Sequence, residues 1–165
     1  RMIDMISDDE GSFSPERAGG LPGFQLIKMA TSGEYDYHSL MKKVQRNGGL
    51  MAHLGTDDVR GVEKMITSGD EKAALVLEAM AYNVAKNIGK LSVVVCGKVD
   101  AIILTGGIAY SKRVTEWITD RVSFIAPVVV LAGENEMESL AFGALRVLRG
   151  EEKAHAFSLK NRLNA

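Results

Sequence analysis

Two adjacent glycines follow an apolar run in the segment VDAIILTGGIAYSKRV, residues 99–114. Residues 99–105 have the composition of a buried strand, and the apolar face of a helix begins shortly afterwards. In a parallel sheet, such a junction leaves backbone N–H groups free at a helix N-terminus, where they can bind a phosphate or a nucleotide. Gly106 and Gly107 lack a Cβ, so a ligand could lie directly against the backbone. The alternative interpretation is a tight turn in which Ser111 caps the helix.

Length and charge limit the classes of protein to which this chain can belong. With 165 residues, 46% of them hydrophobic and 25% charged, it has the composition of an ordinary globular domain. Its net charge of −1 provides no general attraction to nucleic acid or to an anionic membrane, so we expect neither partner. No apolar run approaches the roughly 20 residues that cross a bilayer, and the first residues do not resemble a signal peptide, so we expect a cytoplasmic protein.

The metal-binding and redox-active residue types are sparse. Cys96 is the single cysteine, which excludes an internal disulfide and a cysteine-rich zinc site. It lies in the apolar segment VVVCG, so we expect it to be buried. The three histidines are scattered singly and lack the spacing of metal ligands, so none of them is assigned a role.

The first third of the chain is predicted to be a loop followed by short helices. Residues 11–23 are rich in glycine and proline, which is typical of a loop with defined turns. Helices are expected at about residues 24–31 and 36–46, and the second of them should stop at the following glycine pair. Thr56 is then positioned to cap a further short helix.

A long amphipathic helix is predicted in the middle of the chain. Apolar residues recur every three or four positions from Leu77 to Leu91, which is the period of one helix face. Ser68 and Glu71 have the spacing of a capping box. We therefore expect this helix to run from about residue 70 to about residue 95.

Strands and helices alternate in the remainder of the chain. Residues 99–105 and 127–131 are short apolar runs typical of buried strands, and residues 1–7 show the alternation of a third strand. Strand, helix, strand and helix joined by short connections predict parallel strands in an α/β domain. The last helix is expected to turn its apolar residues inward, which are Met137, Leu140, Ala141, Ala144, Leu145 and Leu148.

Several segments in this order resemble the C-terminal portion of butyrate kinases, which are relatives of acetate kinase. They are FSPERAGGLP, GGLMAHLGTDDVRGVEKM, GDEKAALVLEAMAYNVAKNIGK, VDAIILTGGIAYSKRV and ENEMESLAFGALRVLRGEE, and they span nearly everything up to about Phe157. The resemblance implies a ribonuclease-H-like (actin-like ATPase) domain, an α/β fold with helices packed on a mixed sheet, incomplete at its N-terminus. It also implies reversible phosphoryl transfer between ATP and a short-chain carboxylate such as butyrate, with Mg²⁺.

The same resemblance implies a domain organisation. Residues 1–150 would form the C-terminal nucleotide-binding domain, with a helical insertion at about 11–66, and residues 151–165 an extension. The phosphate-contacting segments of the family's N-terminal domain are absent from this sequence, so the isolated chain is expected to be inactive. The family also implies a homo-oligomer. The alternative is a non-catalytic module that uses the same fold to bind nucleotide or to dimerise.

The segment TGGIAYS matches the adenosine motif of these kinases. The resemblance implies that the base and ribose lie against Gly106, Gly107 and Ile108, with Ser111 nearby. Acetate kinases place an Asn where this chain has Ser111 and a Gly where it has Ala109, so the adenine contacts are expected to differ from theirs.

The segment TDDVR resembles the acetate kinase segment SDFR. The resemblance implies that Asp58 binds the ribose hydroxyls and that Val59 and Arg60 lie against the base. Taken without the resemblance, Asp57 and Asp58 are acids that favour the start of a helix, and Arg60 is a solvated charge.

Arg17, in SPERAGG, matches an arginine that faces the transferred phosphoryl group in acetate kinases. Charge spreads over three oxygens in the transition state of phosphoryl transfer, and a planar guanidinium can bridge two of them. The alternative for Arg17 is a surface arginine paired with Glu16.

Glu136, in NEMES, aligns with a glutamate linked to Mg²⁺ in acetate kinases. A carboxylate oxygen, directly or through a water, suits a cation that keeps several of its waters. The alternative for Glu136 is a first-turn acid beside a capping pair formed by Asn135 and Glu138.

Overall fold

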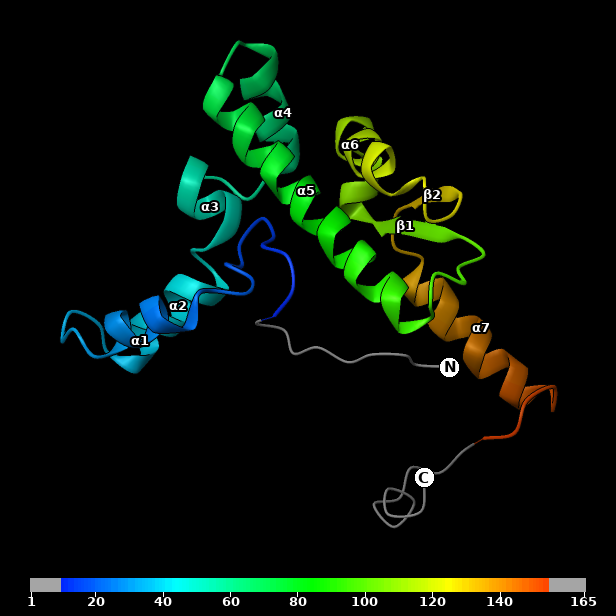
Figure 1. The fold of residues 1–165 in the computed structure, drawn as a ribbon. Helices are drawn as coiled ribbons and strands as arrows, with labels where there is room; N and C mark the ends of the chain where they lie inside the picture. The colour runs from blue at the N-terminus through cyan, green and yellow to red at the C-terminus, as the bar shows by residue number, and fades with distance from the viewer. Residues whose placement is uncertain (1–9, 155–165) are drawn as a thin grey trace. The chain divides into compact units, whose positions relative to one another are not determined.

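The structure, a computed structural model, describes residues 10–154 (Figure 1). The helices predicted at residues 24–31 and 36–46 are confirmed within one residue. The described elements are, in chain order, α1 (Gly23–Ala30), α2 (Tyr37–Gln45), α3 (Gly49–Leu54), α4 (Val59–Thr67), α5 (Glu71–Val94), β1 (Ile102–Gly106), the 3₁₀ turn η1 (Gly107–Tyr110), α6 (Lys112–Val122), β2 (Val128–Ala132) and α7 (Glu136–Leu148).

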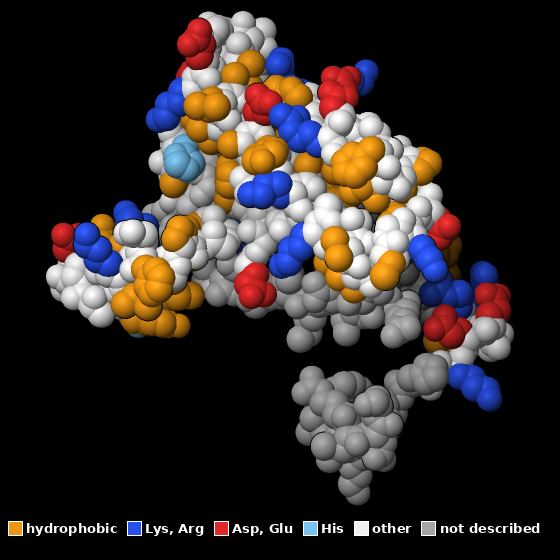
Figure 2. Space-filling view, viewed as in Figure 1, with side chains coloured by type: hydrophobic (Ala, Val, Ile, Leu, Met, Phe, Trp, Pro, Cys, Tyr) orange, Lys and Arg blue, Asp and Glu red, His pale blue; other side chains and the backbone are white. Residues whose placement is uncertain are grey.

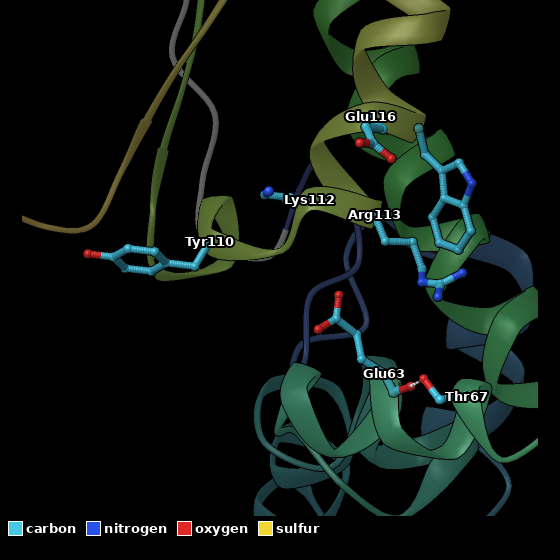
Figure 3. A pocket seen from close by; sticks show the side chains of 7 residues that line it. Glu63, Thr67, Tyr110, Lys112, Arg113 and Glu116 are labelled. Carbon is cyan, nitrogen blue, oxygen red and sulfur yellow. Dashed lines mark hydrogen bonds between the residues drawn. The ribbon is translucent and has the colours of Figure 1, made fainter.

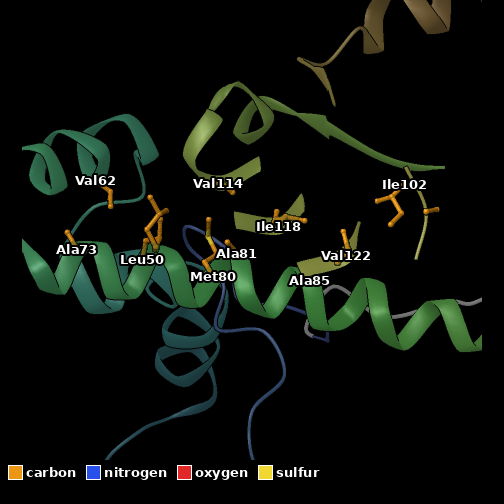
Figure 4. Packing of buried hydrophobic residues seen from close by; sticks show 12 residues of the cluster. Leu50, Val62, Ala73, Met80, Ala81, Ala85, Ile102, Val114, Ile118 and Val122 are labelled. Atoms are coloured by element: carbon orange, nitrogen blue, oxygen red, sulfur yellow. The ribbon is translucent and has the colours of Figure 1, made fainter. Parts of the chain in front are cut away.

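Helix α5 organises the core, and its 24 residues confirm the long helix predicted from the apolar period. Its buried positions recur at helical spacing and include three alanines, whose small side chains let neighbouring helices approach closely. Helices α4 and α6 pack along it through Val62, Val114, Ile118 and Val122 (Figure 4). Complete burial of Leu77 contributes roughly 2 to 3 kcal/mol to folding.

The helix ends differ in detail from the sequence prediction. Asp58, and not Thr56, caps α4, while the Thr56 hydroxyl accepts a hydrogen bond from the Asp58 backbone N–H at 3.2 Å. Asp70 caps α5 by accepting from the Ala73 N–H at 2.9 Å, so the capping-box pairing predicted for Ser68 with Glu71 is wrong. An aspartate immediately before the first helical residue provides a carboxylate acceptor for the N–H groups of the first turn.

Cys96 is exposed, so the expectation of burial is wrong. It lies just beyond the end of α5 and has a φ of 53°, a left-handed conformation that turns the chain out of the helix. The apolar residues before Cys96 belong to the last turn of α5, where other parts of the protein no longer cover the helix. Val93, for example, is 74% exposed. Apolar composition therefore did not indicate burial here.

Strands β1 and β2 form a parallel pair, with Ile102 opposite Val128 and Gly106 opposite Ala132. The parallel arrangement confirms the prediction from the alternation of strands and helices. Ile102 is buried, whereas Ile103, on the opposite face of the same strand, is 59% exposed. The strand predicted at residues 1–7 lies outside the described residues.

The chain divides into two compact units, residues 1–133 and 134–165. The second unit contains α7, whose first turn carries Glu136 and Glu138. None of the residues of α7 is buried, and Met137 and Leu148 are about four-fifths exposed, at 80% and 81%. The inward packing predicted for this helix stays a prediction.

The surface is mixed in character. On the face shown in Figure 2, acidic, basic and apolar side chains are interspersed over the helices of the first unit, without a large patch of one charge. This agrees with the near-neutral net charge of −1. Within residues 10–154, no helix combines the length and the apolar character that crossing a bilayer requires.

Candidate functional site

The strand-to-helix junction predicted as a nucleotide site is a tight turn with open space above it. Gly106 ends β1 with a φ of 87°, a conformation that favours glycine, and exchanges backbone hydrogen bonds with Gly133 at 3.1 and 3.2 Å. Gly107 follows, and a Cβ added there would meet no heavy atom within 4 Å. The protein itself does not require a glycine at this position for space, so the backbone of Gly107 is accessible to a ligand.

Ser111 ends this turn and caps α6. It is 8% exposed, and its Oγ accepts a hydrogen bond from the Val114 N–H at 3.2 Å. The same hydroxyl donates to Oε1 of Glu63 at 2.6 Å, a contact between residues 48 positions apart. The capping interpretation of Ser111 is therefore confirmed, while its contact with adenine stays a prediction.

Asp58 and Arg60 begin helix α4. Oδ1 of Asp58 accepts from both the backbone N–H and the Nε–H of Arg60, each at 3.1 Å. The hydrogen bond from the Arg60 side chain is the main cause that holds the pKa of Asp58 below its ordinary value. The helix-start interpretation of Asp58 is thus observed, and the backbone N–H of Gly61 is a further, smaller cause of the lowered pKa.

The Glu63–Ser111 hydrogen bond brings the two predicted adenosine segments to one place. Glu63 lies three residues after Arg60 on α4, and Ser111 ends the turn that contains Gly107. Sequence reasoning missed Glu63. The sequence indicated Glu63 only weakly. It lies four residues after Val59, a spacing that places both on the same face of a helix.

A polar cavity of about 620 Å³ lies beside this bond, between α4 and the start of α6 (Figure 3). Its volume falls within the range of small-molecule sites. The guanidinium of Arg113 lies 5.7 Å from the centre of the Trp117 ring, so a cation and an aromatic surface are paired on one wall. The lining residues are Glu63, Thr67, Tyr110, Lys112, Arg113, Glu116 and Trp117.

Arg17 occupies a loop that is fixed by its backbone. The Ser14 N–H donates to the Arg17 carbonyl, and the Arg17 N–H donates to Ser14 Oγ, both at 3.0 Å. The Gly48 N–H donates to the Glu16 carbonyl at 2.9 Å, which ties the loop to the start of α3. The Arg17 side chain is exposed, and no ion pair joins it to Glu16 in the described part of the chain, so a fixed backbone presents a free guanidinium.

Gly48 and Gly49 make this attachment sterically possible. A Cβ on Gly49 would overlap the carbonyl oxygen of Ser14, and one on Gly48 would overlap the backbone nitrogen of Ala18. Gly49 also has a φ of 54°. Any other residue would push the Arg17 loop away from α3.

An apolar cavity of about 460 Å³ connects the Arg17 loop with the glycine turn. Ser12, Phe13 and Ser14 line it on one side, and Ile108 and Ala109 on another. The structure therefore brings the start of the Arg17 loop and the predicted adenosine segment to a common space within the first unit.

Glu136 belongs to the second unit. It lies in the first turn of α7, and its carboxylate is exposed. Asn135 makes no side-chain capping bond, so the predicted capping pair with Glu138 is not observed. No group of three or more metal-ligating side chains occurs among residues 10–154. A single carboxylate nevertheless suits Mg²⁺, because this cation usually takes one or two carboxylates and completes its shell with water and phosphate.

The sequence profile of the acetokinase family matches residues 17–139, a range that contains every candidate residue named above. The chain belongs to the acetokinase family. It is 57% identical over 144 residues to a protein described as a probable butyrate kinase from Bacteroides thetaiotaomicron, and 53% identical over 150 residues to butyrate kinase 1 of Clostridium acetobutylicum. These matches cover 87% and 91% of this chain but only 41% and 42% of the relatives. The chain thus spans less than half the length of these relatives.

Solved acetate kinases share the fold. The acetate kinase of Porphyromonas gingivalis superimposes with a TM-score of 0.75 at 19% identity, covering 84% of this chain and 41% of that one. The acetate kinase of Entamoeba histolytica gives 0.72 at 18% identity, with 84% and 44% covered. These similarities confirm the predicted α/β fold of the acetate kinase type, of which this chain contains a part.

Proposed function

We propose that residues 1–165 form the C-terminal, nucleotide-binding part of a carboxylate kinase of the butyrate kinase type. In the proposed reaction, a carboxylate oxygen of the fatty acid attacks the γ-phosphorus of ATP. The bond to the bridging oxygen breaks, and the products are an acyl phosphate and ADP. The observation that carries the proposal is the open backbone at Gly107, held beside the start of α4 by the Glu63–Ser111 bond.

The proposed residue roles come from the family resemblance, and the open turn supports them. Gly106, Gly107 and Ile108 would form the surface for the ribose and base, because no side chain covers Gly107. The Asp58 carboxylate would accept from the ribose hydroxyls, and Val59 and Arg60 would flank the base. Ser111 would act mainly by shaping the turn, since its hydroxyl is already bonded twice.

Arg17 and Glu136 would serve the phosphates. The exposed guanidinium of Arg17 would neutralise charge that develops on the transferred phosphoryl group. Glu136 would hold Mg²⁺, directly or through a water, and the metal would supply charge neutralisation at the β- and γ-phosphates. Homo-oligomerisation and a cytoplasmic location remain predictions from the sequence.

The decisive experiment compares the full-length protein that would contain this segment with residues 1–165 alone. Acyl phosphate formation from butyrate, ATP and Mg²⁺ is measured as the hydroxamate, and ADP binding by calorimetry. We expect turnover only from the full-length protein, because the phosphate-contacting segments that the resemblance assigns to the N-terminal domain are also needed to position the phosphoryl group. Robust turnover by residues 1–165 would show that these residues contain the whole active site, and would contradict the need for the second set of groups. ADP binding by the full-length protein without turnover would favour a non-catalytic nucleotide-binding module.

The proposed role of Glu136 has its own test. Glu136→Gln in the full-length kinase should raise the Mg²⁺ concentration needed for half-maximal activity about fivefold, because a neutral amide is a poorer partner for a hard cation. Glu138→Gln, on the same helical turn, is the matched control. Identical Mg²⁺ titrations for Glu136→Gln and the parent enzyme would leave Glu136 as a first-turn acid only.

A further inference from the structure

We infer that Glu63 is a positioning residue for the nucleotide: through Ser111 it sets the distance between the two segments that hold the base and ribose. The inference rests on the proposed function and adds to it a residue that lies outside the matched adenosine motifs. It starts from one contact, the 2.6 Å hydrogen bond from Ser111 Oγ to Glu63 Oε1.

The bond joins the middle of α4, at Glu63, to the end of the glycine turn, at Ser111. On α4, Glu63 lies three and four residues after Arg60 and Val59, which places it on the same side of the helix. On the other segment, Ser111 is the last residue of the turn that begins after Gly106. A change in this bond is therefore transmitted directly to both proposed walls of the nucleotide site.

Apolar packing alone does not determine the spacing of these walls. Val62 and Val114, the buried residues next to Glu63 and Ser111, belong to the apolar cluster along α5. Such contacts are non-directional, so they fix the spacing of the two walls less sharply than a directional bond does. A short hydrogen bond to a carboxylate depends steeply on distance and angle, and is stronger than a neutral one.

No neighbouring cation in the described part of the chain competes with Ser111 for the Glu63 carboxylate. Lys112 and Arg113 line the same cavity, and Figure 3 shows the Glu63 carboxylate pointing toward the turn that carries them. In the described part of the chain, however, neither forms an ion pair with Glu63. Ser111 is 8% exposed, so water has little access to the hydroxyl, and loss of the acceptor would leave a buried donor unsatisfied.

The expected kinetic consequence is a change in KM without a change in kcat. In this inference Glu63 acts on the nucleotide through Ser111, and the phosphoryl group is handled elsewhere, by Arg17 and Mg²⁺ in the proposed function. Misplaced walls weaken binding of ground state and transition state alike, which raises KM and leaves kcat unchanged. A net hydrogen bond to a charged acceptor corresponds to about a tenfold effect or more.

The test uses the full-length kinase that contains this segment, with ATP as the varied substrate. Glu63→Ala should raise KM for ATP about tenfold and change kcat less than about twofold. Glu63→Gln should remain near the parent value, because its amide oxygen can still accept from Ser111. Asp120→Ala removes an exposed carboxylate of α6 that does not line this cavity and makes no described bond to Ser111, and it should leave KM unchanged.

A double variant separates this bond from other effects of either residue. Ser111→Ala removes the donor and also the cap of α6, so it should raise KM and lower the melting temperature. If Glu63 affects nucleotide binding through its hydrogen bond with Ser111, the double variant Glu63→Ala with Ser111→Ala should have the same KM for ATP as Ser111→Ala alone.

The outcomes distinguish this inference from the function on which it rests. A parent enzyme that forms no acyl phosphate contradicts the proposed function. An active parent whose KM for ATP is unchanged by Glu63→Ala overturns the inference alone, even if the melting temperature falls. Additive effects of the two substitutions, or a Glu63→Gln variant as impaired as Glu63→Ala, also overturn it.

Discussion

Two glycine pairs in this chain have opposite surroundings. At Gly48 and Gly49, the positions that a Cβ would occupy are already filled by the backbone of the Arg17 loop. At Gly106 and Gly107, the first glycine is required by a φ of 87°, and the second borders open space. In the sequence, both pairs are the same Gly-Gly dipeptide.

The difference shows two separate uses of a missing side chain. The first pair permits close contact of the protein with itself, and so fixes the loop that presents Arg17. The second pair leaves a backbone surface that the protein does not cover, which suits a ligand. Substitution at the first pair should therefore affect folding, and substitution at Gly107 should affect binding.

The largest effect is expected from the residue that the first pair positions. Arg17→Ala in the full-length kinase should lower kcat by on the order of 10³-fold, with little change in KM for ATP, because its charge acts mainly in the transition state. Arg17→Lys should restore little of this, since an ammonium cannot bridge two phosphoryl oxygens. Arg46→Ala, another exposed arginine near the same loop, is the control. An unchanged kcat for Arg17→Ala would remove the residue from the mechanism.

The next effect tests the filled space at the first pair. Gly49→Ala should destabilise residues 1–165 by about 3 kcal/mol or more, because a left-handed φ and a backbone overlap coincide there. Gly55→Ala has a φ of 74° but no neighbour within 4 Å, so it should cost only about 1 kcal/mol. Urea unfolding measures both. Equal losses for the two variants would show that the contact with Ser14 is unimportant.

A smaller effect is expected at the open pair. Gly107→Ala should leave the free energy of unfolding within about 0.5 kcal/mol of the parent, because the added Cβ meets nothing within 4 Å. It should nevertheless raise KM for ATP about tenfold in the full-length kinase, if the nucleotide lies against this backbone. Gly89→Ala, in the interior of α5, also has no neighbour within 4 Å and should leave KM unchanged. Matching KM values for both variants would place the nucleotide elsewhere.

The smallest effect concerns the pH dependence of Asp58. Its pKa is lowered from 3.8 by hydrogen bonding to Arg60, so its ionised form stabilises the fold above about pH 4. This stability is lost as the pH falls through the lower, folded-state pKa. Asp58→Asn keeps a capping oxygen but loses the charge, and should lower the melting temperature slightly at pH 7, by an amount that shrinks as the pH falls through the folded-state pKa. A difference that grows toward acid pH would contradict the pKa shift.

Much of the fold could be predicted from local patterns in the sequence. The period of apolar residues determined the long helix α5 within a residue or two, because one face of a helix must be apolar to pack. The short apolar runs predicted β1 and β2 and their parallel pairing. Family motifs indicated Arg17, Asp58 and the glycine turn, and the family match includes all of them.

Only the tertiary structure decided which groups meet. The acceptor for Ser111 is Glu63, 48 positions away, and the backbone that fills the space beside Gly49 is that of Ser14. Cys96 is exposed despite its apolar neighbours. Apolar periodicity is a local property of one helix or strand, and it can be read along the chain. Hydrogen-bond partners and steric contacts between distant segments depend on distances of a few ångströms, which arise only when those segments pack on the same helix.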